Sequence, residues 1–194
     1  MRKLVWAVAV ALAGMASAQA DDLSYSYAEG GFGVVDFDAL NEDGDGYFVG
    51  GSVGFGTNWL GFAEYSVASF DESGAEADID EIQIGFGGHF PMNDSVDFIG
   101  KLAYVDQSIE VSVPGFGSAS DSENGFMLSA GVRGVAVGRL DLTGEIQYVD
   151  VGESDDTGLA LRGLYEFTDM FSLGARVGMS DDVTQYGVFA RFTF

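Results

Sequence analysis

The chain ends in the stretch TQYGVFARFTF, residues 184–194, in which apolar side chains recur at every second position. The apolar parity holds Tyr186, Val188, Ala190, Phe192 and Phe194, and the other parity includes Gln185, Gly187, Arg191 and Thr193. Two-residue alternation is typical of a β-strand whose two faces meet different surroundings. This stretch predicts a final strand with one apolar face.

The same alternation recurs about ten times along the chain. The predicted strands cover residues 23–35, 46–56, 59–71, 78–90, 96–106, 124–136, 139–150, 157–167, 171–180 and 184–194. So many one-faced strands cannot all cover a solid core in a chain of this length, which indicates that the apolar faces meet lipid. We therefore predict an all-β fold, an antiparallel up-and-down transmembrane β-barrel of ten strands. A soluble secreted β-sandwich is the alternative fold.

Connections between these strands alternate in length. Short ones are predicted at residues 56–58, 91–95, 137–138 and 168–170, and longer ones at 36–45, 72–77, 107–123, 151–156 and 181–183. Bacterial barrels place short turns in the periplasm and longer loops outside the cell. Both chain ends should then face the periplasm, as an even number of strands requires.

The apolar parity is expected to face lipid, with Ile84, Leu142 and Val188 as clear examples and Ala28, Gly30, Phe32 and Val34 in the less regular first strand. Aromatic side chains concentrate near strand ends, where amphipathic rings favour the membrane interface. The outer girdle is predicted to contain Tyr47, Tyr65, Tyr104, Phe126, Tyr148 and Tyr186, and the periplasmic girdle Phe55, Trp59, Phe90, Phe167, Phe171 and Phe192.

Charged residues within the strands fall on the opposite parity, which would face the lumen. A lumen charge network is predicted from Glu29, Glu64, Glu81, Lys101, Arg133, Asp141, Glu145, Arg162, Arg176 and Arg191, with Asp97 and Arg139 on the same parity. A basic side chain on the lipid face costs about 2–4 kcal/mol at the bilayer midplane. The restriction of charged residues to one parity therefore supports a barrel. The network could be a charged constriction for solutes or a salt-bridged plug. Leu60, Phe62, Ile99, Leu164 and Phe189 also point inward, and such a narrow lumen favours the plug.

The N-terminus predicts export. Arg2 and Lys3 precede an apolar run that ends near Ala16, and small residues follow. This pattern is typical of a secretory signal peptide, predicted as residues 1–20, with the barrel as residues 21–194. The apolar run is shorter than a membrane helix needs. The predicted localisation is the outer membrane.

The composition excludes several classes of protein. Removal of the predicted signal peptide would take away Arg2 and Lys3 and leave 6 of the 8 basic residues against 31 acidic ones. Nucleic acid is excluded as a partner because its binding requires a cationic surface. The chain has no cysteine and hence no disulfides. His89 is the only histidine, and it is predicted near Pro91 at the periplasmic end. No catalytic residues and no enzymatic activity are predicted.

One motif in the first loop points to metal. Asn41, Asp43 and Asp45 have the spacing of a calcium loop, and Gly46 allows its turn, but Ser52 stands where a bidentate carboxylate is needed. A solvated acidic loop explains the same residues better. We expect no cofactor and at most weak Ca²⁺ or Mg²⁺ binding at the acidic outer rim.

The sequence resembles a known group of proteins in its overall pattern. The signal peptide, the tyrosine-rich segment LSYSYAEGG, the short turns and the terminal Phe194 are similar to small Gram-negative outer-membrane barrels of the OmpX and opacity-protein type. Those have eight strands, which is the alternative to ten here. LSYSYAEGG and GDGYFVGGSVGF also resemble, more faintly, a family of small barrel proteins under diffusible-signal control.

The resemblance also implies partners. In similar proteins the alternating C-terminal strand is read by the barrel-assembly machinery, which implies an assembly signal at Tyr186, Val188, Ala190, Phe192 and Phe194. Periplasmic chaperones, outer-membrane lipid and lipopolysaccharide are the other expected partners. The predicted function is a structural or surface-interaction role with a largely closed lumen, and the alternative is a narrow channel for small solutes.

Overall fold

A computed structural model describes residues 23–37, 43–72, 75–115, 117–181 and 183–194. The predicted signal peptide lies outside these residues and stays a prediction. The elements are ten strands: β1 Tyr27–Phe37, β2 Gly44–Phe55, β3 Trp59–Glu72, β4 Ala75–Asn93, β5 Val96–Val113, β6 Gly117–Val137, β7 Leu140–Val151, β8 Ser154–Glu166, β9 Phe171–Met179 and β10 Val183–Thr193.

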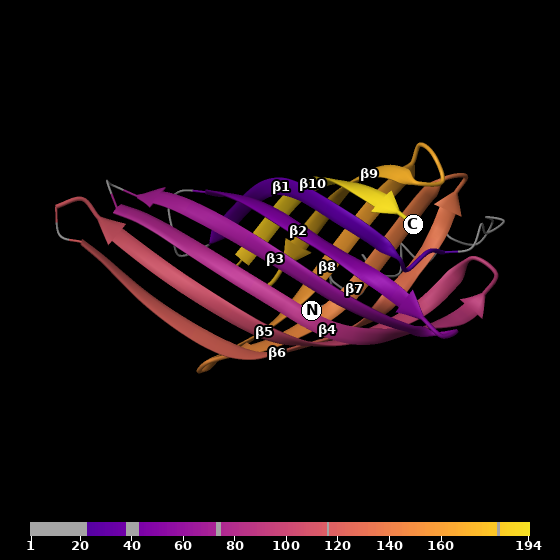
Figure 1. Ribbon diagram of the computed structural model, residues 1–194, viewed down its shortest axis with the longest axis horizontal. Coiled ribbons are helices and arrows are strands. Elements are labelled where there is room, and N and C mark those ends of the chain that lie inside the picture. The colour runs from indigo at the N-terminus through magenta and orange to yellow at the C-terminus, as the bar shows by residue number, and fades with distance from the viewer. Residues whose placement is uncertain (1–22, 38–42, 73–74, 116, 182) are drawn as a thin grey trace.

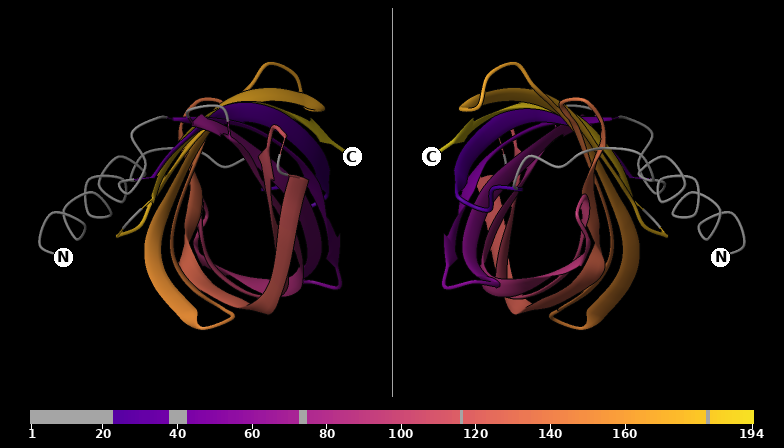
Figure 2. Two further views of the ribbon diagram at one scale, coloured as in Figure 1. Left: turned by 90° about the vertical axis from the view of Figure 1, so that its left-hand side faces the viewer. Right: turned by 90° about the vertical axis from the view of Figure 1, so that its right-hand side faces the viewer.

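The strands form one closed antiparallel barrel (Figures 1 and 2). Each strand pairs with its neighbours in the chain, and β1 pairs with β10, with Tyr27 opposite Thr193 and Phe37 opposite Val183. Closure gives every strand a partner on both sides, which a sheet in lipid needs because its backbone groups have no water to bind. The prediction of a ten-stranded up-and-down barrel is confirmed.

Glycine allows the closing strands to approach each other. A Cβ atom on Gly33 would collide with the carbonyl oxygen of Tyr186, and one on Gly31 with that of Val188. Both carbonyl groups belong to β10, so the seam between β1 and β10 needs residues without a side chain here. This explains why glycine occupies positions 31 and 33 of the first strand.

The two faces of the barrel wall differ as the alternation predicts. Phe32, Ile84 and Val188 have 69%, 57% and 49% of their surface exposed, whereas Leu60 and Phe189 keep 2% and 4%. The predicted girdle residues are exposed or half-buried, and some are neighbours across strands, such as Tyr104 opposite Phe126 and Phe171 opposite Phe192. The outside of the wall is therefore apolar, as a lipid-facing surface must be.

One side of the barrel is much taller than the other. β4, β5 and β6 have 19, 18 and 21 residues, whereas β9 has 9 and β10 has 11. The long strands project beyond the rest of the wall at one end (Figure 1). We call this end the outer end and the opposite end, which holds Phe194, the inner end.

The long strands on this side contradict two of the predicted loops. Residues 107–123 were expected to form a long loop, but Gln107 pairs with Glu123 and Ser112 with Ser118, so β5 and β6 continue to a tight turn. The prediction for 72–77 is wrong for the same reason, because β3 and β4 pair as far as Glu72 and Ala75. The lipid-facing parity is serine-rich and acidic beyond Tyr104 and Phe126, so it gives no apolar signal there, yet backbone hydrogen bonds extend the hairpins.

The inner end also differs in detail from the expectation. Pro91 was placed in a turn, but it belongs to β4, where the register with β5 shifts between Pro91 and Asn93. Proline lacks a donor and is tolerated at such an irregularity. The first strand begins at Tyr27 rather than at residue 23.

Candidate functional site

Glu29 is the centre of the ion pairs inside the barrel. Its carboxylate accepts hydrogen bonds from Nη1 of Arg162 at 2.6 Å and from Nη2 and Nε of Arg191 at 2.6 and 2.8 Å. The Glu29 side chain is 2% exposed, and that of Arg191 is 7% exposed. A buried carboxylate needs this many charged donors to offset its desolvation.

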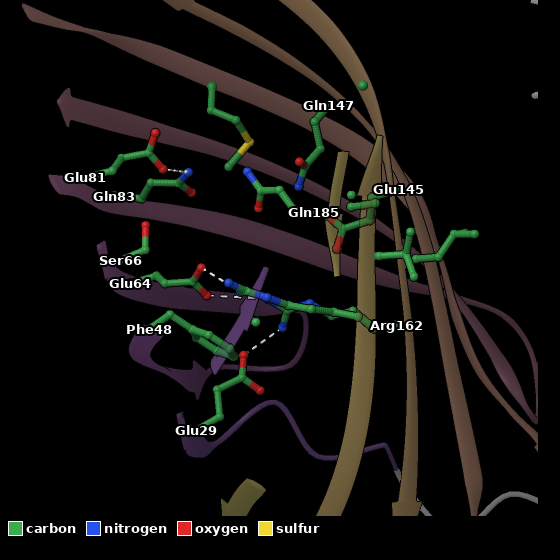
Figure 3. Close-up of a pocket in the computed structure, with 18 of the residues that line it drawn as sticks. Glu29, Phe48, Glu64, Ser66, Glu81, Gln83, Glu145, Gln147, Arg162 and Gln185 are labelled. Atoms are coloured by element: carbon green, nitrogen blue, oxygen red, sulfur yellow. Dashed lines mark hydrogen bonds and ion pairs between the residues drawn. The ribbon is translucent and has the colours of Figure 1, made fainter. Parts of the chain in front are cut away.

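The ion pairs continue to the far wall through Glu64. Nη2 of Arg162 lies 3.4 Å from one Glu64 oxygen, and Nη1 of Arg176 lies 3.0 Å from the other. Arg162 is on β8 and Glu64 is on β3, which are five strands apart in either direction around the barrel. The Arg162 side chain therefore crosses the lumen, as Figure 3 shows. We call Glu29, Glu64, Arg162, Arg176 and Arg191 the central network.

Aromatic rings hold two of these guanidinium groups in place. The guanidinium carbon of Arg176 lies 3.4 Å from the ring centre of Phe48, and that of Arg191 lies 3.7 Å from the ring centre of Tyr27. A cation over an aromatic face gains roughly 0.5–2 kcal/mol, more when it is desolvated. Inward-facing rings thus stabilise charges in the lumen.

A second ion pair lies on the β5–β7 side. Nζ of Lys101 is 2.8 Å from Glu145, whose other oxygen accepts a hydrogen bond from Ser129 Oγ at 2.8 Å.

Glu81 differs from the other predicted lumen carboxylates. It accepts a hydrogen bond from Gln83 at 2.8 Å, and no Lys or Arg of the described residues lies within ion-pair distance of it.

A further cluster lies at the inner end, and the sequence did not predict its centre, Tyr25. The Tyr25 hydroxyl donates to Asp97 at 2.7 Å, and its ring stacks on His89 with centres 3.9 Å apart. The guanidinium carbon of Arg133 lies over the Tyr25 ring, 4.7 Å from its centre. Burial raises the pKa of the Tyr25 phenol, so it stays neutral and donates. We call Tyr25, His89, Asp97, Arg133 and Asp141 the inner cluster.

Further contacts tie this cluster together and hold the chain before β1 in place. Arg133 Nε and Nη2 donate to Asp141 at 2.9 and 2.7 Å, and its Nη1 donates to the carbonyl oxygen of Ser24 at 2.8 Å. His89 Nδ1 lies 3.0 Å from Asp97. The predicted first strand includes residues 23–26, whereas in the structure they precede β1 and Tyr25 packs against Leu60 and Ile99. Alternation gives the side of the strand on which Tyr25 lies but not these contacts.

The position of Arg139 contradicts the prediction that every basic residue after the signal peptide faces the lumen. It lies between β6 and β7, its side chain is 46% exposed, and its partner Asp169 is 96% exposed. Since a turn separates the two strands there, parity no longer fixes the direction of the side chain.

A cavity of about 430 Å³ occupies the lumen around the central network. Its lining extends from Tyr25 and Arg133 at the inner end to Ser180 and Gln185 towards the outer end. Figure 3 shows Gln147 and Gln185 beyond Arg162, across from Glu81 and Gln83. Polar amides thus line the outer part of the lumen, and ion pairs its middle.

The predicted metal residues are only partly described. Asn41 lies outside the described residues, and Asp43 and Asp45 are exposed at the start of β2. Among the residues that the structure describes, no group of three His, Cys, Asp or Glu side chains could hold a metal ion.

The predicted assembly residues all belong to the C-terminal end of the wall. Tyr186, Val188, Phe192 and Phe194 are exposed on the outer face, and Ala190 is half-buried between them. The Phe194 amide donates to the Ser26 carbonyl oxygen at 3.1 Å, which fixes the chain end beside the start of β1.

Solved structures share this architecture at low sequence identity. The transport unit of the autotransporter AIDA-I from Escherichia coli has a TM-score of 0.52 and 10% identity, over 100% of this chain and 97% of that one. Neisserial surface protein A has a TM-score of 0.50 and 11% identity, over 90% and 100%. The attachment invasion locus protein Ail of Yersinia pestis, bound to the heparin analogue sucrose octasulfate, has a TM-score of 0.50 and 16% identity, over 88% and 100%.

The comparison with curated protein sequences gives no match. The family model for the outer membrane protein beta-barrel domain, in contrast, matches residues 6–159, well over half of the chain. Both this match and the closed, apolar-walled barrel place the protein in the outer membrane. The chain belongs to the outer-membrane β-barrel domain family.

Proposed function

We propose that the protein is a structural or surface-interaction barrel whose lumen is largely closed by its own ion pairs. The observation that carries this proposal is the path of Arg162, which runs from β8 to Glu64 on the opposite wall. A solute crossing the barrel would have to displace this side chain from two carboxylates. Breaking such a buried pair costs about 3–5 kcal/mol, which makes spontaneous opening rare.

The tall outer side supports a role at the cell surface. The β5–β6 hairpin reaches beyond the shorter strands (Figure 1). Its outer part is exposed and acidic, with Glu110, Asp121 and Glu123 among its residues. Ail is described with a heparin analogue, but a polyanion of that kind would be repelled by this acidic surface. Neutral or cationic surfaces are the better partners for the hairpin.

No catalytic role is part of the proposal. His89 is held between Tyr25 and Asp97 at the inner end, far along the barrel from the exposed outer hairpins. A hydrolytic site at the outer rim would need a general base placed there.

A narrow channel for small solutes is the second candidate, and one observation favours it. The lining of the lumen cavity reaches towards both ends of the barrel, so gaps persist beside the central network. Water or small ions could use such gaps without displacing Arg162.

Conductance in planar bilayers separates the two functions. The purified wild-type protein is expected to give no steady current, or only small and infrequent events, because Arg162 and Arg176 remain paired. Arg162→Ala and Glu145→Ala should raise the leak, and Arg139→Ala, which removes an exposed pair, should not. Steady ohmic openings of the wild type, with ion selectivity lost in Glu145→Ala, would instead establish the channel.

We also propose that the outward residues of β10 form the signal for the barrel-assembly machinery. Deletion of Phe194 is expected to lower the amount of folded protein in the outer membrane several-fold, because the terminal aromatic group is lost from the strand that closes the barrel. Folding of the purified variant into lipid vesicles should be affected much less. Equal loss in cells and in vesicles would mean that Phe194 acts only through stability.

A further inference from the structure

Four glutamine side chains line the outer part of the lumen cavity. They are Gln83 on β4, Gln107 on β5, Gln147 on β7 and Gln185 on β10. Gln83, Gln147 and Gln185 are labelled in Figure 3, where Gln185 lies between the other two. The residues come from separate strands, so their amides face the same space from several sides.

Most of the hydrogen-bonding capacity of these amides is unused. Gln83 donates to Glu81 at 2.8 Å, but the side chains of Gln107, Gln147 and Gln185 make no hydrogen bond within the described part of the chain. A primary amide has two donors and an acceptor with two lone pairs. The outer cavity therefore offers both kinds of partner to a polar molecule that enters it.

Glu81 gives this space a charge that the protein does not balance with an ion pair. The other predicted lumen carboxylates, Glu29, Glu64, Asp141 and Glu145, each lie within 3.4 Å of a Lys or Arg nitrogen. Glu81 lines the cavity, half-buried, and among the described residues its one side-chain hydrogen bond comes from the Gln83 amide. A partly desolvated carboxylate is stabilised by a nearby cation.

The approach to the cavity favours cations as well. Asp156 joins Glu81 in the cavity lining, and Asp121, Glu123 and Asp155 are exposed at the outer ends of β6 and β8. A concentration of one sign of charge raises the local concentration of the opposite ion and speeds its association. Anionic solutes would be repelled before they reach the glutamines.

We propose that the outer lumen is a binding site for a small organic cation that carries a primary ammonium group and several hydroxyl groups, the chemistry of an amino sugar. The ammonium binds the Glu81 carboxylate, and the hydroxyl groups exchange hydrogen bonds with Gln107, Gln147 and Gln185. The site lies on the outer side of the central network. It goes beyond the proposed function, since it needs neither an open nor a closed lumen below it.

Titration calorimetry of the whole barrel in detergent micelles tests the site, with glucosamine as the probe in a buffer near neutral pH, where the amine still carries its proton and acid does not neutralise the Glu81 carboxylate. Glucose and N-acetylglucosamine have related rings without the ammonium group. Glucosamine is expected to bind saturably, with both neutral sugars at least about tenfold weaker, as the loss of one charged hydrogen bond predicts. Glu81→Gln should weaken glucosamine binding by a similar factor, and Gln147→Ala should weaken it less.

The matched control is Glu110→Gln, the same substitution at an exposed position on β5 that does not line the cavity. It is expected to leave glucosamine binding unchanged. The proposal is overturned if glucosamine does not bind at millimolar concentration, or if glucose binds equally well. It is also overturned if Glu81→Gln has no effect, or if Glu110→Gln weakens binding as much as Glu81→Gln, which would indicate general attraction to an acidic rim. None of these outcomes depends on conductance.

Discussion

Replacing Glu29 by alanine is expected to lower the free energy of unfolding of the barrel by about 3–5 kcal/mol, the cost of breaking a buried ion pair. Arg191 would lose its only carboxylate partner among the described residues while staying almost fully buried, and Arg162 would keep only the longer contact to Glu64. Urea unfolding of protein folded into lipid vesicles measures the change, and heat-modifiable gel mobility confirms that the variant folds.

Two further variants show whether charge pairing is the cause. Asp169→Ala breaks a 3.5 Å pair whose members are largely exposed, and little change is expected because water screens such pairs. Glu29→Ala combined with Arg191→Ala should cost less than the sum of the single variants, since the unpaired guanidinium is removed together with its partner. A loss for Glu29→Ala no larger than for Asp169→Ala would contradict a role of the central network in stability.

The alternation of residue types predicted most of the wall because the membrane enforces it. Ile84 and Val188 face outward and Leu60 and Phe189 inward, as period-two sequence requires when one side is lipid. Beyond the membrane this constraint disappears. Residues 107–112 and 118–123 form a paired hairpin in water, where backbone hydrogen bonds suffice. Ile109 and Val111 still alternate with polar residues, but on the lumen-side parity and not on the parity of Tyr104.

The lumen was predictable in its composition but not in its pairing. Parity placed Glu29, Arg162 and Glu64 inside, yet only the closed strand order puts β8 opposite β3 and lets Arg162 reach both carboxylates. Tyr25 was missed because it precedes the first strand, and its position depends on contacts with Asp97 and His89 far away in sequence. The alternation of residue types predicts which face of the wall a side chain lies on, whereas its partner across the lumen depends on the number and register of the strands.

Arginine at Phe86 is expected to destabilise the barrel by about 2–4 kcal/mol, the cost of a basic side chain near the middle of a bilayer. Phe86 is 54% exposed on the outer face of β4, where it lies opposite Gly61 and Leu102. It lies between Ile84, the partner of the outer-girdle residue Tyr104, and Phe90 in the periplasmic girdle. Vesicle unfolding in urea measures the loss, and lipids with shorter acyl chains should reduce it because the charge then lies nearer to water.

The chain offers a matched control for the effect of lipid. Ser120 on β6 is also exposed, on the same face as the girdle residue Phe126, but it lies six residues farther toward the outer end, a distance of about 20 Å at the rise of an antiparallel strand. Ser120→Arg should therefore meet water and change stability by less than about 0.5 kcal/mol, as surface substitutions usually do. Comparable losses at Phe86 and Ser120 would contradict the membrane boundary at the aromatic girdle. A large loss at Phe86 alone would locate that boundary between the levels of Phe86 and Ser120, so that the outer ends of β5 and β6 stand in water, where a surface partner can reach them.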